Sequence, residues 1–464
     1  SSIIKKLIEK KAIIKFVFRN NGFNKHYELN TIVLEDVEKI YCQDLKENKT
    51  ILLLEKLVGN KFIYNSYKKG LAFTLFELYR MNLHLGILTN EMKNPKENIY
   101  FYPGKTFVEL GSLPFVKKYI KSKFLVKFSF FGKIVFKLFY SVNKLKWVLI
   151  YCAFPFWVLL SIGIPSLKKS SNLKYDIGIR VGDSDWALGN KYRTFDFLID
   201  NQHIKSENTI FCIEEKISDD YKRRILEKNY HFIEIRRILK NIDISYIRTI
   251  FFGRFFPVYL NCLVKSFFEN IYVMTMTAKL FHKYLLWSAF SLEYQLNHYV
   301  TYDEYLPEDI LRNILLEKKG IKTWKYAHST ASPDYYEPLG SNFLVLIFSF
   351  YYYDTFVVWG KKMELFYKKH PNNIKNFEKL GCLWSEQVRI SLERKQKNDV
   401  LNVALKKFSE NGKFIPETII GVFDNTAGGD APLSDDDLIN FFEAILTLLA
   451  DYPKFGVIIK INSL

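Results

Sequence analysis

Three segments place polar side chains directly after runs of strand-forming residues. "IKTWKYAH" ends on His328 and is followed at once by Ser329. "LKYDIGIRVGDSDW" contains an Asp-x-Asp pair that includes Asp185, and "YQLNHYVTYDE" ends on Glu304. An imidazole or a carboxylate at such a position can take a proton from a hydroxyl, and a histidine can also donate to a phosphate or sugar oxygen. We therefore predict His328, Asp185 and Glu304 as catalytic residues.

Each of these residues also has a structural interpretation. A lone histidine often bonds a neighbouring carbonyl, and an Asp-x-Asp pair is common in solvated turns. Asp303 and Glu304 are also favourable near the N-terminal dipole of a helix. The Asp-x-Asp pair would suit Mg²⁺ or Mn²⁺ bound to a nucleotide diphosphate, although the arrangement requires no metal and we expect no cofactor.

Two glycine-containing turns follow further strand-like runs. Gly360 lies between "VVW" and "KKMELF", and Asp424, Asn425 and Thr426 open the loop "DNTAGGDAPLS". Glycine permits tight turns and close backbone approach, and helix N-termini attract phosphate. The spacing matches neither GxGxxG nor a P-loop, and GxSxG, HExxH and kinase motifs are absent from the sequence.

Strands that alternate with helices must position these turns. From Asn172 onward apolar strand-like runs alternate with amphipathic segments, interrupted by a long helical stretch over roughly 236–292. This alternation predicts a parallel sheet with helices on its faces, and ligands bind outside the carboxyl ends of such strands. A second strand–helix–strand unit begins near Lys413. The fold class is thus α/β with two Rossmann-like lobes, preceded by a mostly helical N-terminal region.

The net charge limits the classes of binding partner, and the cysteine content indicates the redox compartment. The formal net charge of the 464-residue chain is +18, which suits a polyanion or an anionic membrane. The five cysteines are dispersed and never in CxxC spacing, so a reducing compartment fits. We see no signal peptide after "SSIIKKLIEKK".

A basic, aromatic block favours the membrane over nucleic acid. No Asp or Glu occurs from Gly111 through Lys174, and lysines alternate with Phe before an uncharged run at 147–166. Three interpretations stay open: a monotopic segment on the cytoplasmic leaflet, a single transmembrane helix at 147–166, and a buried core helix. A nucleic-acid groove would have Arg and polar readers instead. The predicted membrane-binding residues are Lys117, Lys118, Lys121, Lys123, Lys127, Lys133, Lys137, Trp147 and Trp157.

An ordered set of segments resembles a known family. "GIKTWKYAHS", "DTFVVWGKKMELFYKKH", "KLGCLW", "IIGVFDNT" and "SDDDLINFFEAILTLLADYPKFGVIIK" resemble bacterial surface-polysaccharide biosynthesis proteins of the Pro-Phe-Thr-Ser motif type. These are similar to GT-B glycosyltransferases and distantly to capsule Kdo transferases and CDP-glycerol glycerophosphotransferases. The resemblance implies a nucleotide-sugar donor and a growing or lipid-linked glycan acceptor. It also implies donor-binding roles for Ser329, Gly360, Asp424, Asn425 and Thr426.

These observations define one expected organisation. A mixed, mostly helical region at 1–110 precedes the membrane-associating segment at 111–170, an acceptor lobe at 171–395 and a donor lobe at 396–464. Because the Pro-Phe-Thr-Ser motif itself is missing before Leu464, we expect the donor lobe to be truncated. The expected function is a membrane-associated glycosyltransferase for capsule or O-antigen type polysaccharide at the cytoplasmic face of the inner membrane. A polyol-phosphate transferase and an inactive membrane scaffold are the alternatives.

Overall fold

The structure is a computed structural model in which the chain divides into two compact units. The first unit comprises 1–27, 85–95 and 383–464, and the second comprises 28–84 and 96–382. The residues described are 22–91, 113, 130–162, 173–181, 199, 204–214, 217–241, 251–301, 306–327, 344–382, 385, 406–410, 416–423 and 435–460.

Long helices form one part of the larger unit. Tyr67 of α4 donates to Thr277 of α13 or accepts from it over 2.7 Å, and Tyr272 of α13 donates to the carbonyl of Tyr67. Asn270 begins α13 by accepting from the amide of Val273 at 2.8 Å, as an N-cap residue does. The helices are α2 (Gly22–Ile40), α3 (Lys49–Val58), α4 (Tyr64–Glu91), α7 (Phe130–Ile162), α10 (Ile238–Asn241), α12 (Phe256–Ser266) and α13 (Ile271–Glu293).

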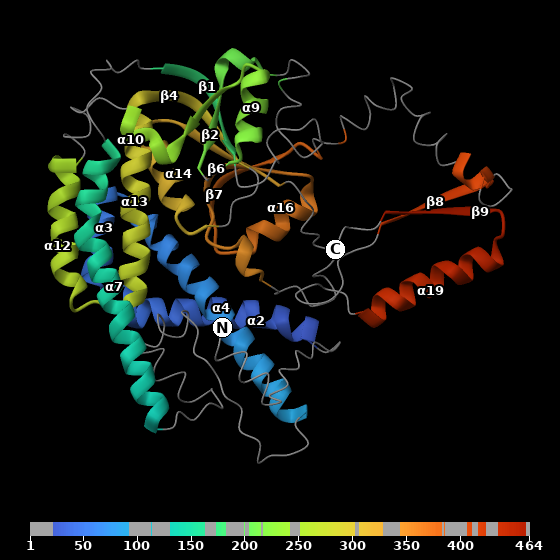
Figure 1. Ribbon diagram of the computed structural model, residues 1–464, viewed down its shortest axis with the longest axis horizontal. Helices are drawn as coiled ribbons and strands as arrows, with labels where there is room; N and C mark the ends of the chain where they lie inside the picture. Colours follow the sequence, from blue (N-terminus) through green and yellow to red (C-terminus); the bar gives the residue numbers. More distant parts are fainter. Residues whose placement is uncertain are drawn as a thin grey trace. The chain divides into compact units, whose positions relative to one another are not determined.

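A seven-stranded parallel sheet forms the other part of this unit (Figure 1). Its order is β3-β2-β1-β4-β5-β6-β7, and every neighbouring pair is parallel. The strands are β1 (Leu173–Val181), β2 (Thr209–Ile213), β3 (His231–Glu234), β4 (Tyr294–Thr301), β5 (Lys322–Tyr326), β6 (Tyr352–Val358) and β7 (Asn373–Lys379). The helices between them include α9 (Asp219–Glu227), α14 (Asp309–Glu317) and α16 (Lys361–Lys368).

The predicted parallel sheet with alternating helices is confirmed. Apolar side chains from the helices and from β2, β4 and β6 share one core, in which Tyr67, Trp287 and Tyr299 are fully enclosed. β7 was not predicted, because its sequence "NIKNFEK" is polar. It is an edge strand, exposed or half-exposed at every position, and therefore needs no apolar run.

The smaller unit contains a second strand–helix–strand element. β8 (Thr418–Phe423) and β9 (Phe455–Lys460) pair in parallel, with α19 (Asp435–Asp451) between them along the chain. A parallel pair requires such a crossover, so the predicted element near the C-terminus is confirmed. The domain boundaries given above stay predictions.

The basic, aromatic block provides a long helix, α7, that includes Pro155. Within the described ranges, no helix is both long and apolar enough to cross a bilayer. Trp147 and Trp157 are partly buried and pack against the core, whereas Lys137 is exposed. The remaining predicted membrane lysines, apart from the backbone of Lys133 in α7, lie outside the described residues.

Candidate functional site

The sheet reverses its direction of growth between β1 and β4. From β1 the chain adds β2 and then β3 on one side, and from β4 it adds β5, β6 and β7 on the other. The connections after β1 and β4 therefore diverge, and ligands of open α/β sheets bind at this switch point, outside the carboxyl ends of the strands.

The three predicted catalytic residues follow neighbouring strands at this edge. Asp185 follows β1, Glu304 follows β4 and His328 follows β5, and these strands are adjacent in the order β1-β4-β5. The residues themselves, and Ser329 beside them, lie outside the described part of the chain, so their roles stay predictions. The sheet does bring together the strand ends from which they depart.

The end of β5, just before His328, is held to β6. The amide of Ala327 donates to the carbonyl of Val357 at 3.0 Å, and the indole Nε1 of Trp359 donates to the carbonyl of Ala327 at 2.6 Å. A backbone with two such bonds has a fixed direction at this point. The segment that begins with His328 thus departs from a rigid position.

The predicted donor-binding turns are only partly described. Gly360 lies between β6 and α16, as expected, with φ −178°, which is extended backbone that any residue adopts. A Cβ atom there would meet nothing within 4 Å, so neither the backbone nor packing requires glycine. Asp424, Asn425 and Thr426 follow β8 in the smaller unit and lie outside the described residues.

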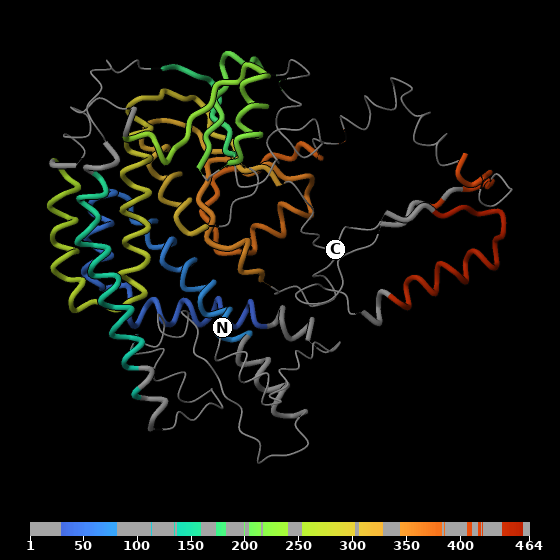
Figure 2. The backbone as a smooth tube through the Cα atoms, in the orientation of Figure 1, coloured from blue at the N-terminus to red at the C-terminus, as the bar shows by residue number. Residues whose placement is uncertain are grey.

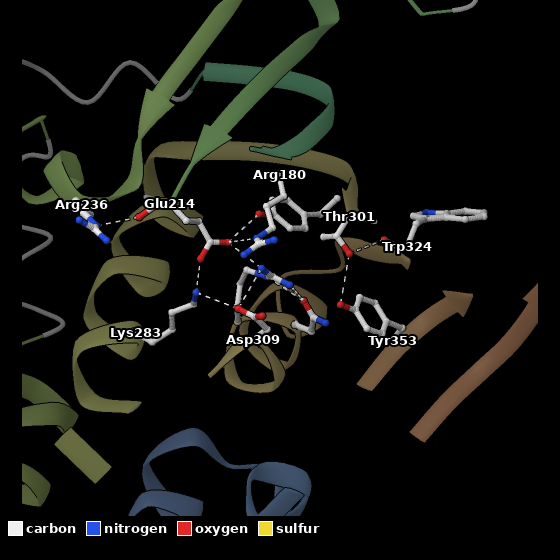
Figure 3. Close-up of polar contacts among 11 residues, drawn as sticks. Arg180, Glu214, Arg236, Lys283, Thr301, Asp309, Trp324 and Tyr353 are labelled. Carbon is white, nitrogen blue, oxygen red and sulfur yellow. Dashed lines mark hydrogen bonds and ion pairs between the residues drawn. The ribbon is translucent and has the colours of Figure 1, made fainter. Parts of the chain in front are cut away.

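A cluster of buried charges lies at the carboxyl end of β2, beside the switch point (Figure 3). Its acceptor is Glu214, the residue directly after β2, whose side chain is 8% exposed. Lys283 of α13 donates to this carboxylate, and Nη1 of Arg312 in α14 donates to it at 2.8 Å. The Nε of Arg180 in β1 lies 3.6 Å from the same group. We call Arg180, Glu214, Lys283, Asp309 and Arg312 the charge cluster.

Asp309 and aromatic rings complete the charge cluster. The Asp309 carboxylate accepts from Lys283 at 3.2 Å and lies 3.6 Å from Nη1 of Arg312. The Arg312 guanidinium lies 4.9 Å from the ring centroid of Tyr299 and 5.5 Å from that of Trp287, distances at which the ring faces attract a cation. Arg312 is fully buried, so it is stabilised by ion pairs and aromatic faces in place of water.

The electrostatics of Glu214 follow from these neighbours. Burial by itself raises the pKa of its carboxyl, but the positive charges of Lys283, Arg312 and Arg180 outweigh burial and hold the pKa well below its usual value. Burial lowers the pKa of Lys283, and the carboxylates of Glu214 and Asp309 more than offset this, so that pKa is raised. Glu214 and Lys283 are therefore both charged at neutral pH.

This arrangement has a structural role: its ion pairs hold together the strands and helices around the switch point. The charge cluster joins strands β1 and β2 to helices α13 and α14, which lie far apart in the sequence. Thr301, the last residue of β4, contacts the hydroxyl of Tyr353 in β6 at 3.4 Å (Figure 3). In the part of the chain that the structure describes, no group of three or more His, Cys, Asp or Glu side chains could hold a metal ion.

Glu214 directly follows the strand-forming run "TIFCI" in the sequence, but its partners are not apparent there. Arg312 lies within "DILRNILL", where a helical stripe of apolar residues surrounds one arginine. A charge at a core-facing position of an amphipathic helix is the signal that would have identified it. The partner carboxylate on another strand is not visible in the sequence.

Comparison with known proteins supports a general role. Residues 251–462 match the family model described as "Polysaccharide biosynthesis PFTS motif protein". This range begins before α12 and includes β4 to β9. No curated protein and no solved structure matches the chain. The family match thus supports a polysaccharide biosynthesis protein.

Proposed function

We propose that the protein is a membrane-associated glycosyltransferase of GT-B type that transfers a sugar from a nucleotide-sugar donor to a growing surface polysaccharide. The observation that supports this most is the order β1-β4-β5, from whose carboxyl ends the segments with Asp185, Glu304 and His328 depart. The family match to polysaccharide biosynthesis proteins supports a role in making a polysaccharide.

In this proposal the larger unit provides the acceptor side. His328 takes the proton from the acceptor hydroxyl as it attacks the anomeric carbon, and Asp185 and Glu304 orient the hydroxyl or the imidazole. The bond between the anomeric carbon and the donor phosphate breaks, and the nucleotide departs with the bonding electrons. The transition state resembles an oxocarbenium ion and is stabilised by groups placed before the reaction.

The smaller unit would bind the donor. Asp424, Asn425 and Thr426 directly follow β8 in the sequence, and ligands of open α/β sheets bind outside the carboxyl ends of the strands. Ser329 and Gly360, which belong to the larger unit, stay predicted donor-binding residues. A nucleotide sugar is then a substrate, no cofactor is required, and the charge of the departing phosphate is neutralised by amides and cations of the chain.

Donor binding can be tested directly. We expect one member of a panel of uridine, guanosine, cytidine and thymidine nucleotide sugars to raise the melting temperature and to give saturable heat in calorimetry. Thr426→Ala should weaken binding of that donor, whereas His328→Ala should bind it normally and lose transfer to a glycan acceptor. Binding of a nucleotide-linked polyol instead of any nucleotide sugar would favour the polyol-phosphate transferase. An absence of binding by all of these would favour the inactive scaffold.

A further inference from the structure

Helix α7 has an apolar surface that faces away from the core of the larger unit. Leu138, Val142, Leu145, Leu149 and Phe156 are between 58% and 68% exposed. At 3.6 residues per turn they fall within a sector of about 60°, along roughly 27 Å of helix. On the other side of the helix Val148, Tyr151 and Val158 are buried.

Lysines border this apolar stripe, and acidic residues are absent from it. Lys137 and Lys146 are exposed and lie on opposite sides of the stripe, about 110° and about 70° from its centre. The helix Phe130–Ile162 contains no Asp or Glu. Such a helix lies in a membrane interface, with its apolar side chains among the acyl chains and its lysines at the headgroups.

Helix α12 packs against the buried side of α7 and has exposed apolar side chains of its own. Tyr259 of α12 donates to the carbonyl of Tyr151 in α7, and its ring is 5.4 Å from that of Phe154, so the two helices are in contact (Figure 2). Leu260, Val264 and Phe267 are 46%, 59% and 55% exposed, and Phe268 is 90% exposed. No Asp or Glu occurs in α12 either.

The nearest carboxylate to this surface is already bound elsewhere. Glu269, directly after Phe268, accepts from the side chains of Asn48 at 3.1 Å and Thr50 at 3.0 Å in α3. These hydrogen bonds hold its carboxylate against α3. None of the exposed side chains of α7 and α12 is acidic.

We propose that α7 and α12 form a membrane-docking face for the cytoplasmic leaflet of an anionic bilayer. The occupant follows from charge complementarity, because the apolar stripe of α7 has an exposed lysine on each side and no acidic residue in its helix, which matches acyl chains beneath acidic headgroups. This inference deepens the membrane association within the proposed function and adds α12, whose sequence lies outside the basic block. It does not depend on the transferase chemistry.

Flotation of the full chain tests the docking face. We expect it to float with vesicles of phosphatidylcholine mixed with phosphatidylglycerol, and more weakly with phosphatidylcholine alone. Leu145→Glu with Leu149→Glu should reduce the partition coefficient at least tenfold, since each change replaces inserted apolar area by a charge. Val264→Glu with Phe268→Glu should do the same.

Matched controls separate this surface from others. Leu226→Glu places the same charge at an equally exposed position, 59%, on α9, and should leave flotation unchanged. Lys137→Gln with Lys146→Gln should weaken binding about tenfold or more only when acidic lipid is present. All variants should retain the circular dichroism and the donor binding of the parent, because the altered side chains are exposed.

Two results would overturn the inference. One is undiminished flotation of both acidic double variants. The other is a wild-type dimer in sedimentation that Leu145→Glu with Leu149→Glu converts to monomer while neither form floats, which would assign the face to a second copy of the chain. Donor binding is measured without vesicles, so a failure of the docking face and a failure of the proposed transferase remain distinguishable.

Discussion

Because Glu214 is the carboxylate that three cations of the charge cluster surround, removing its charge should strongly destabilise the larger unit. Glu214→Gln keeps the shape of the side chain and removes one negative charge from the reach of Lys283, Arg312 and Arg180. Of the two carboxylates in the charge cluster, Lys283 and Arg312 would then keep that of Asp309, at 3.2 and 3.6 Å. The two cations would stay buried and would have lost one of the two carboxylates of the charge cluster.

The magnitude follows from the burial of the partners. Arg312 is fully buried and the side chain of Glu214 is 8% exposed, so water cannot replace the lost charge. Removing one partner of such a pair costs about 3–5 kcal/mol, because an uncompensated charge remains inside. We expect a loss of this size in the free energy of unfolding of the larger unit.

The assay is urea unfolding, in which hydrogen exchange of peptides from α13 and α14 reports the free energy of unfolding of these helices. Glu227→Gln in α9 is the matched control: Glu227 lies 3.6 Å from Arg223, both side chains are more than 60% exposed, and the loss should be below about 0.5 kcal/mol. In a double-mutant cycle, Glu214→Gln with Arg312→Met should cost at least about 1 kcal/mol less than the sum of the single changes.

The pH dependence gives an independent check. Because the pKa of Glu214 is lowered in the folded state, its contribution is complete above its unfolded pKa, near 4.5, and is lost as pH falls toward the folded value. The unfolding free energy of Glu214→Gln should therefore fall less steeply below pH 4.5 than that of the parent. Equal losses for Glu214→Gln and Glu227→Gln, with unchanged pH dependence, would refute the reasoning.

Two further predictions concern the supports of the fold. The pKa of His370 is lowered to about 4 by burial, aided by the charge of Lys369, and its ring bonds the carbonyl of Phe366 at 2.9 Å while accepting from the amide of Val345 at 2.9 Å. The contribution of His370 to the free energy of unfolding should be constant above pH 6.5 and fall by about 3 kcal/mol as the pH is lowered to 4, because the unfolded state binds the proton first. In urea titrations at pH 7 and 5, His370→Leu should lose less stability between the two pH values than the parent protein. An identical loss would contradict this. Asn270→Ala removes the cap of α13 and should cost about 1 kcal/mol, whereas Asn270→Gly should cost only a few tenths, as measured by thermal unfolding; equal costs would show that the cap bond is not the source.

The strand and helix pattern was predictable because local spacing determines it. Ser218 begins α9 by accepting from the amide of Tyr221 at 3.1 Å, and Gly320, with φ 78°, follows α14, as their positions in the sequence indicate. The apolar run of β2, which is buried at every position, likewise marks a buried parallel strand. β7 escaped prediction because an edge strand can be polar on both faces.

The predicted site was determined only in part by these local signals. That His328, Asp185 and Glu304 follow strands can be read from the sequence, but that β1, β4 and β5 are neighbours depends on the order of pairing. For the same reason Trp147 and Trp157, which an interfacial helix would favour at the headgroups, pack against the core of the larger unit instead. The side of a helix that faces the protein is decided by its neighbours.

By itself, then, the sequence determined the kinds of element, their order, the basic character of residues 111–174 and the similarity to polysaccharide biosynthesis proteins. Only the tertiary structure decided that Glu214 meets Arg312, 98 residues further along the chain, and that α12 packs against α7. Both depend on contacts between distant segments. The periodicity of apolar residues predicts which positions are buried, but it does not predict which distant residues they contact.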